Sequence, residues 1–223
     1  MRITLRHLFD LYMAGVFSLF PIVNPLGAIP LFLTLTARLD PAGRRHVAFR
    51  AALFVFLILT IALCAGGLIM EFFGISIPAV RVAGGMIIAY IGFRMLFPET
   101  APRTDSPAYD EGSAHASALI PLALPTMSGP GSIAVVIGMS SEIADVAGLA
   151  NRLLGYGVLV VVNLTIAVAC LWVLRSGARL ARFLGKDGTE SLSRIMGFLL
   201  VCIGVQFIAT GVQEGRALMK LVR

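Results

Sequence analysis

The chain has 223 residues, of which 58% are hydrophobic and only 13% charged, and its mean hydropathy is +0.91. Soluble domains carry about a quarter of charged residues, so this composition excludes a soluble fold and indicates an integral membrane protein. The net charge of +6 is typical of membrane proteins that gather Lys and Arg in cytoplasmic loops. The sequence offers no basic, aromatic-rich surface, so we expect no nucleic-acid partner.

Six apolar segments follow one another along the chain, and we interpret each as a spanning helix of about 20 residues. They are residues 11–37, 51–70, 82–93, 116–141, 153–174 and 195–213. The third is bracketed by Arg81 and Arg94, and it spans only if both side chains reach toward opposite surfaces. Such continuous apolar runs lack the alternating pattern of barrel strands, which leaves helices as the spanning structure.

A polar segment, residues 98–115, contains three prolines and divides the six helices into two sets of three. We therefore expect one unit at 1–97, this linker, and a second unit at 116–223. The two units share an ordered set of matches. These are Pro21, Gly27 and Ile29 with Pro125, Gly131 and Ile133 (offset 104), 59–62 with 164–167 (offset 105), and Gly85, Ile91 and Gly92 with Gly197, Ile203 and Gly204 (offset 112). An odd number of helices per unit predicts two inverted three-helix repeats, a plan found in secondary transporters.

The Lys and Arg counts predict the orientation of the chain. The connections after the first, third and fifth segments carry 11 of these residues, against 7 in the termini and the other two connections. Because Lys and Arg favour cytoplasmic loops, we expect both termini in the periplasm.

Clusters of Pro and Gly interrupt the first and fourth segments near their centres. They comprise Pro21, Asn24, Pro25, Gly27 and Pro30 in the first, and Pro121, Pro125, Gly129, Pro130 and Gly131 in the fourth. Proline removes a helical donor and displaces a carbonyl, so each cluster predicts a helix broken at mid-membrane. Asn24-Pro25 is a helix-start pattern, with an Asn cap and Pro in the first position, and Gly129-Pro130 is a weaker version of it.

A helix broken at this depth predicts a binding site. The second half-helix presents unpaired N–H groups and the positive end of its dipole, and the first half ends in free carbonyls. Such backbone persists only where it is buried in protein or lines a cavity. The candidate substrate-binding residues are Asn24, Pro25, Gly27, Thr60, Ser128, Gly129, Pro130, Gly131 and Thr165. The alternative is that both clusters merely kink their helices.

Residues for other chemistries are missing from the apolar segments. No Asp, Glu, Lys or His lies deep in any of them, which argues against a proton relay through a buried carboxylate. The sequence has no H-E-x-x-H motif and no paired intramembrane aspartates, so we predict no enzyme activity, no metal site and no cofactor. Cys64, Cys170 and Cys202 lie inside apolar stretches, as small buried side chains do.

Several segments together resemble the MarC family of bacterial inner-membrane proteins. They are residues 24–32 (NPLGAIPLF), 121–125 (PLALP), 129–131 (GPG), 81–85 (RVAGG) and 204–207 (GVQF). The resemblance covers essentially the whole chain and implies a six-helix, multi-pass protein of the bacterial inner membrane. It also implies kinship with small neutral amino-acid transporters and, more distantly, with amino-acid exporters of the LysE type. Ser128 departs from the expected pattern, since alanine is more usual before Gly-Pro-Gly.

The sequence thus predicts an all-α membrane protein that acts as a secondary transporter of small neutral solutes such as amino acids. The alternative is a non-transporting structural or regulatory membrane protein whose breaks only shape packing. The expected partners are the lipid bilayer and the solute, and association into a homo-oligomer is left open.

Overall fold

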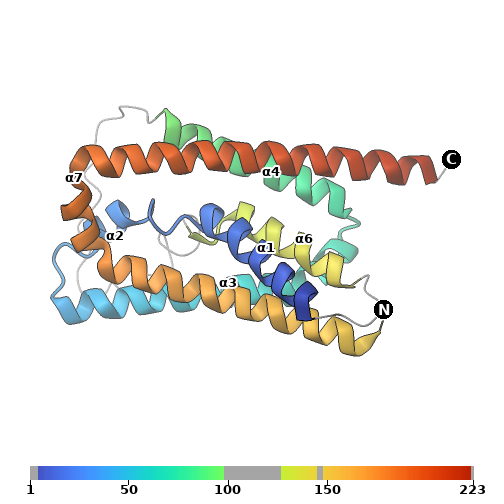
Figure 1. The fold of residues 1–223 in the computed structure, drawn as a ribbon, viewed down its shortest axis with the longest axis horizontal. Coiled ribbons are helices and arrows are strands. Elements are labelled where there is room, and N and C mark those ends of the chain that lie inside the picture. Colours follow the sequence, from blue (N-terminus) through green and yellow to red (C-terminus); the bar gives the residue numbers. More distant parts are fainter. Residues whose placement is uncertain (1–4, 98–126, 145–147, 222–223) are drawn as a thin grey trace.

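The structure is a computed structural model that describes residues 5–97, 127–144 and 148–221. All regular structure in these ranges is helical (Figure 1). The helices are α1 (Leu5–Val23), α2 (Ile29–Leu35), α3 (Pro41–Phe72), α4 (Ile77–Leu96), α6 (Pro130–Ala144) and α7 (Leu149–Leu221). The core is built from buried apolar side chains of α1, α3, α6 and the first part of α7, among them Leu19, Leu59, Val135 and Ile166.

The long helix α7 consists of two arms that meet at Gly185. This glycine has φ 66° and ψ −172°, a conformation that side chains with a Cβ rarely adopt. The N-terminal arm (Leu149–Arg179) and the C-terminal arm (Glu190–Ala217) run in opposite directions (Figure 1). The described ends of α1 and α7 and the α3–α4 connection all lie toward the same end of the molecule, at the right of Figure 1.

Four described helices are long and apolar enough to cross a membrane: α3, α4 and the two arms of α7. They contain the second, third, fifth and sixth apolar segments of the sequence. The first segment forms α1 and α2, which are separated by a non-helical stretch. The fourth is described only from residue 127 onward, where α6 includes a shorter apolar helix, Pro130–Ser141. The predicted linker, residues 98–115, lies outside the described residues.

Side chains hold the turn between α2 and α3. Asp40 caps α3, because its Oδ1 accepts a hydrogen bond from the Gly43 N–H at 2.7 Å, and Pro41 occupies the first turn. Arg44 reaches back from α3, and its Nε donates to the carbonyl oxygens of Thr36 and Leu39 at 3.0 and 3.1 Å. The carbonyls that follow α2 therefore have a cationic partner within the chain.

The C-terminal arm of α7 packs on α4 through paired glycines. A Cβ atom added to Gly85 would lie 2.6 Å from the carbonyl oxygen of Gly204, and one added to Gly92 would lie 2.5 Å from that of Gly197. The backbones therefore touch, as small residues permit in membrane helices. The predicted repeat, with its offset of 112 residues, matches Gly85 to Gly197 and Gly92 to Gly204. The Gly85–Gly204 contact therefore corresponds to the Gly92–Gly197 contact in the other repeat.

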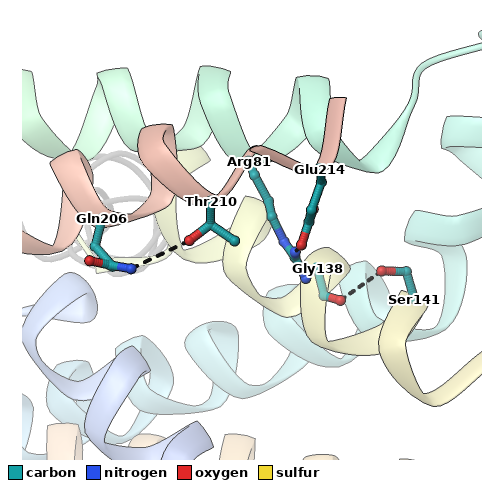
Figure 2. A network of polar contacts seen from close by, with 6 residues as sticks. All are labelled: Arg81, Gly138, Ser141, Gln206, Thr210 and Glu214. Carbon is teal, nitrogen blue, oxygen red and sulfur yellow. Dashed lines mark hydrogen bonds and ion pairs between the residues drawn. The ribbon is translucent and has the colours of Figure 1, made fainter. Parts of the chain in front are cut away.

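Arg81 is an ionic contact point at one end of this helix pair. Its side chain is only 11% exposed and forms an ion pair with Glu214 of the C-terminal arm. Figure 2 shows the side chain leaving α4 toward Glu214, beside Gly138 of α6. A buried charge requires a partner, and Arg81 finds it within the protein. Arg94 at the other end of α4 is exposed.

Candidate functional site

The α1–α2 junction (residues 24–28) interrupts the first apolar segment. Helix α1 ends at Val23, and Asn24 follows with φ 46°, the left-handed region that asparagine tolerates better than most residues. Its Oδ1 accepts a hydrogen bond from the Gly27 N–H at 3.1 Å. A Cβ atom on Gly27 would lie 2.3 Å from Asn24 Nδ2, so this cap requires glycine at position 27.

The amides of the junction are used inside the junction itself. Besides the Gly27 N–H, the Ala28 N–H donates to the Asn24 carbonyl at 3.3 Å and the Ile29 N–H donates to the Leu26 carbonyl at 3.2 Å. The expectation of unpaired amides is therefore wrong for these three residues. Regular helix also resumes at Ile29 and not at Pro25, because the left-handed Asn24 starts a tight turn before α2. Pro25 itself is buried.

The start of α6 is a second place where non-helical backbone lies inside one of the predicted apolar segments. Helix α6 begins at Pro130, the position that the Gly-Pro pattern predicts. The Gly129 carbonyl accepts hydrogen bonds from the Ile133 N–H at 3.2 Å and from the Ser132 hydroxyl at 2.9 Å. Ser128 is 1% exposed, and its Oγ has no hydrogen-bond partner among the described residues. A buried hydroxyl without a partner is uncommon in proteins.

Helix α4 brings the junction and the start of α6 together. Asn24 Nδ2 donates to Met95 Sδ at 3.3 Å, near the C-terminal end of α4. Further along the same helix, a Cβ atom on Gly131 would lie 2.6 Å from Ile88 Cγ1, and it would also lie 3.5 Å from Ile22 Cγ2 of α1. The two interruptions therefore lie next to each other, in contact with one face of α4.

The two threonines among the candidate residues are not joined to this site. Thr165 Oγ1 lies 3.1 Å from the Tyr12 hydroxyl and donates to the Val161 carbonyl at 2.8 Å. Tyr12 lies about three helical turns before Asn24. Thr60 is on α3, and its buried Oγ1 has no hydrogen-bond partner, so no polar contact in the described chain links it to either interruption.

A cavity of about 690 Å³ extends from the α3–α4 connection to the start of α6. Its lining comes from the end of α3, from α4 and from α6, and Ser128 provides the single polar side chain among residues that are otherwise apolar. The lining residues are Met70, Ile75, Ala79, Val80, Ala83, Gly84, Ile87, Ser128, Pro130, Ile133, Ala134 and Ile137. Sequence reasoning missed the α4 wall of this cavity, for which the small residues Ala79, Ala83 and Gly84 are the one visible signal.

The described residues hold no group of three or more His, Cys, Asp or Glu side chains that could bind a metal ion. The chemistry that the site offers is therefore limited to backbone groups, one hydroxyl, one carboxamide and apolar walls. Such a set can bind and orient a small molecule.

Comparison with known proteins identifies the family. The model of the MarC family of integral membrane proteins matches residues 9–215. An inner membrane protein MarC of Escherichia coli (strain ATCC 8739) is 43% identical over 215 residues, which cover 92% of this chain and 96% of the relative. The protein of the same name from Shigella flexneri is 42% identical over 215 residues. No solved structure matches the chain. The chain therefore belongs to the MarC family of multi-pass inner-membrane proteins.

Proposed function

We propose that this protein is a secondary transporter of small neutral solutes such as amino acids. The observation that carries the proposal is the meeting of the α1–α2 junction with the start of α6 against α4, through Asn24–Met95 and Gly131–Ile88 contacts. Non-helical backbone inside apolar segments is tolerated where protein buries it or where it lines a cavity. Transporters place their substrate sites at such interruptions.

The transport cycle follows from two inverted three-helix repeats with termini in the periplasm. This arrangement is supported by the Gly85–Gly204 and Gly92–Gly197 contacts, which the repeat offset exchanges. It is also supported by the placement of both described chain ends at one end of the molecule (Figure 1). We propose that the two repeats rock about the site and open it alternately to either side of the membrane.

The binding residues take different roles in this proposal. Asn24 and Gly27 hold the junction in shape, since they bond to each other. Ser128, which is buried, forms the start of α6 together with Gly129, Pro130 and Gly131, and we propose that this segment faces the solute. Pro25 is buried at the junction, Thr165 contacts Tyr12 of α1, and Thr60 forms no hydrogen bond through its side chain within the described chain.

The alternative function is a structural or regulatory membrane protein that transports nothing. It is favoured by the junction amides, which the chain satisfies by itself. A site built only to shape packing would need no more than these bonds.

The test is counterflow of labelled amino acids in proteoliposomes, with glycine, alanine, serine and leucine in the panel. The matched pair of variants is Asn24→Gly and Thr34→Ala. Glycine tolerates the positive φ of Asn24, so the first variant removes the carboxamide, and with it the cap on the Gly27 N–H, without adding backbone strain. The Thr34 hydroxyl donates to the Pro30 carbonyl within α2, and this residue serves as the control.

We expect stimulated exchange by the wild type, a loss of about tenfold or more in Asn24→Gly, and little change in Thr34→Ala. Thermal unfolding in detergent checks that both variants are folded. A folded wild type that exchanges no member of the panel would refute transport and favour the structural alternative.

A further inference from the structure

We propose that two copies of this chain associate in the membrane through the outer face of the C-terminal arm of α7. This face carries six exposed residues along its length, which we call the arm seam. They are Ile195, Leu199, Cys202, Gln206, Ala209 and Gln213. The inference is independent of transport, because the arm seam contains no residue of the two interrupted segments.

The opposite side of the arm is already occupied by α4. Gly197, Gly204 and Gly211 recur every seven residues, and a Cβ atom added to any of them would lie within 2.8 Å of a backbone oxygen of α4. Cys202 and Ala209 each precede one of these glycines by two positions, which places them about 200° away around the helix. The arm seam therefore faces away from α4, and the arm runs along an edge of the molecule (Figure 1).

The spacing of the arm seam is that of a contact between two helices. Its positions, 195, 199, 202, 206, 209 and 213, alternate steps of four and three residues. This heptad spacing keeps one stripe of a helix against a partner helix over its whole length. Cys202 and Ala209 are small, and small residues allow membrane helices to approach each other closely. Ile195 and Leu199 are 56% and 39% exposed, so the described chain leaves this stripe uncovered.

Two carboxamides in the arm seam need partners that lipid cannot supply. Gln206 lies near the centre of the membrane-spanning helix Glu190–Ala217. Its Nε2 donates to Thr210 Oγ1 of the same arm at 3.5 Å (Figure 2), which is long for a hydrogen bond. The Gln213 side chain has no hydrogen bond within the described chain. Because hydrocarbon offers neither donors nor acceptors, a carboxamide exposed to it costs free energy until another protein group bonds to it.

A second copy of the chain supplies the missing bonds. A carboxamide carries both donors and an acceptor, so it can pair with the same group across a two-fold axis. Two copies inserted in the same orientation bring their arms together in parallel, and residues on the axis meet their own counterparts. Gln206 then pairs with Gln206 of the partner subunit. A water-filled path would also solvate this residue, but the neighbouring Phe198 and Val205 are apolar and 58% and 57% exposed, which favours a helix contact in lipid.

The cysteine of the arm seam permits a direct test. Membranes that contain the full-length protein are oxidised with copper phenanthroline, which joins thiols lying close together. We expect a covalent dimer on a denaturing gel for the wild type and only monomer for Cys202→Ser. Cys64→Ser is the matched control, because Cys64 is also exposed but lies on α3. This variant should form the dimer as the wild type does.

The carboxamide is tested by association in lipid vesicles without cross-linking. Energy transfer between labelled full-length chains gives the dimer fraction as the lipid-to-protein ratio rises. Gln206→Leu removes the polar group at nearly constant size and should raise the dissociation constant about tenfold. Ala209→Ile should raise it about tenfold or more, because the two backbones could no longer approach closely. Ala83→Ile, at an exposed alanine of α4, should match the wild type, and melting temperatures check that all variants are folded.

Other results would overturn the proposal. A chain that stays monomeric at every lipid-to-protein ratio refutes association. A dimer cross-linked through Cys64 places the contact on α3, so the arm seam would be wrong. Modification of Cys202 by a membrane-impermeant thiol reagent would show that this face lines a water-filled path. A dimer equally tight in Gln206→Leu would contradict the pairing of carboxamides.

Discussion

The two pairs of segments that the proposed internal repeat relates differ sharply in how they pack. Helix α4 and the C-terminal arm of α7 meet through glycines, with backbone atoms in contact at Gly85–Gly204 and Gly92–Gly197. The α1–α2 junction and the start of α6 meet through side chains, beside a cavity and a hydroxyl without a partner. The glycines of the first pair leave no space between the two backbones, whereas the second pair contains a buried hydroxyl without a partner among the described residues.

From this difference in packing we infer different roles for the two pairs. Backbone contact leaves no room for a larger side chain at these glycines, so α4 and its partner arm act as a framework. The interrupted pair combines a self-contained cap at Asn24 with an unused donor at Ser128. Polar groups without partners are conspicuous at binding sites because the ligand supplies the missing bond. The predictions below test this division, beginning with the framework.

The largest effect is expected from a leucine in the framework. In Gly92→Leu, the new Cβ would lie 2.5 Å from the Gly197 carbonyl oxygen, and the two helices would have to separate. We expect a loss of about 3 kcal/mol or more, seen as aggregation or a strongly lowered melting temperature in detergent. Gly67→Leu is the control, since a Cβ there meets nothing within 4 Å. If both variants were equally stable, α4 and the C-terminal arm would not form a rigid pair.

An intermediate effect is expected at the junction. Gly27→Ala would place a Cβ 2.3 Å from Asn24 Nδ2 and force the cap apart, at a cost of about 1–2 kcal/mol. Gly157→Ala should have the opposite sign, because nothing lies within 4 Å of its Cβ and alanine favours helix by about 0.5–1 kcal/mol. Thermal unfolding of both variants measures the contrast. A stabilised Gly27→Ala would show that the Asn24 cap does not hold the junction.

The smallest effect on stability is expected at the start of α6, where Ser128→Ala should not lower the free energy of unfolding. Ser128→Ala removes a buried hydroxyl without a partner, so the free energy of unfolding should rise by about 1 kcal/mol or stay unchanged. Ser132→Ala should lower it by about 0.5–1 kcal/mol, because that hydroxyl bonds to the Gly129 carbonyl. Chemical unfolding of the two variants side by side gives the comparison. A destabilised Ser128→Ala would mean that the hydroxyl already has a structural role.

The sequence is sufficient to predict much of the fold. Composition and apolar run length identify a helical membrane protein, and α3, α4 and both arms of α7 coincide with predicted segments. Pro130 is predicted as the start of α6 from its Gly-Pro pattern, since proline is favoured in a first helical turn. The family follows from short motifs, and comparison with known proteins confirms it.

The details of the site depend on contacts between distant residues, which the sequence does not encode locally. Asn24 is predicted as a helix cap, but its left-handed conformation delays α2 to Ile29. The sequence does not distinguish Thr165 from the other polar residues of the apolar segments. In the structure its hydroxyl lies beside the hydroxyl of Tyr12. The contact of Asn24 with Met95 joins helices 71 residues apart, and no local pattern could have predicted it.

The central claim is that a solute binds where the two interrupted segments meet. A structure of the protein in a lipid bilayer with saturating leucine tests it most directly. We predict a solute in contact with both the α1–α2 junction and the start of α6. A solute bound elsewhere, in protein that still exchanges leucine, would contradict the account.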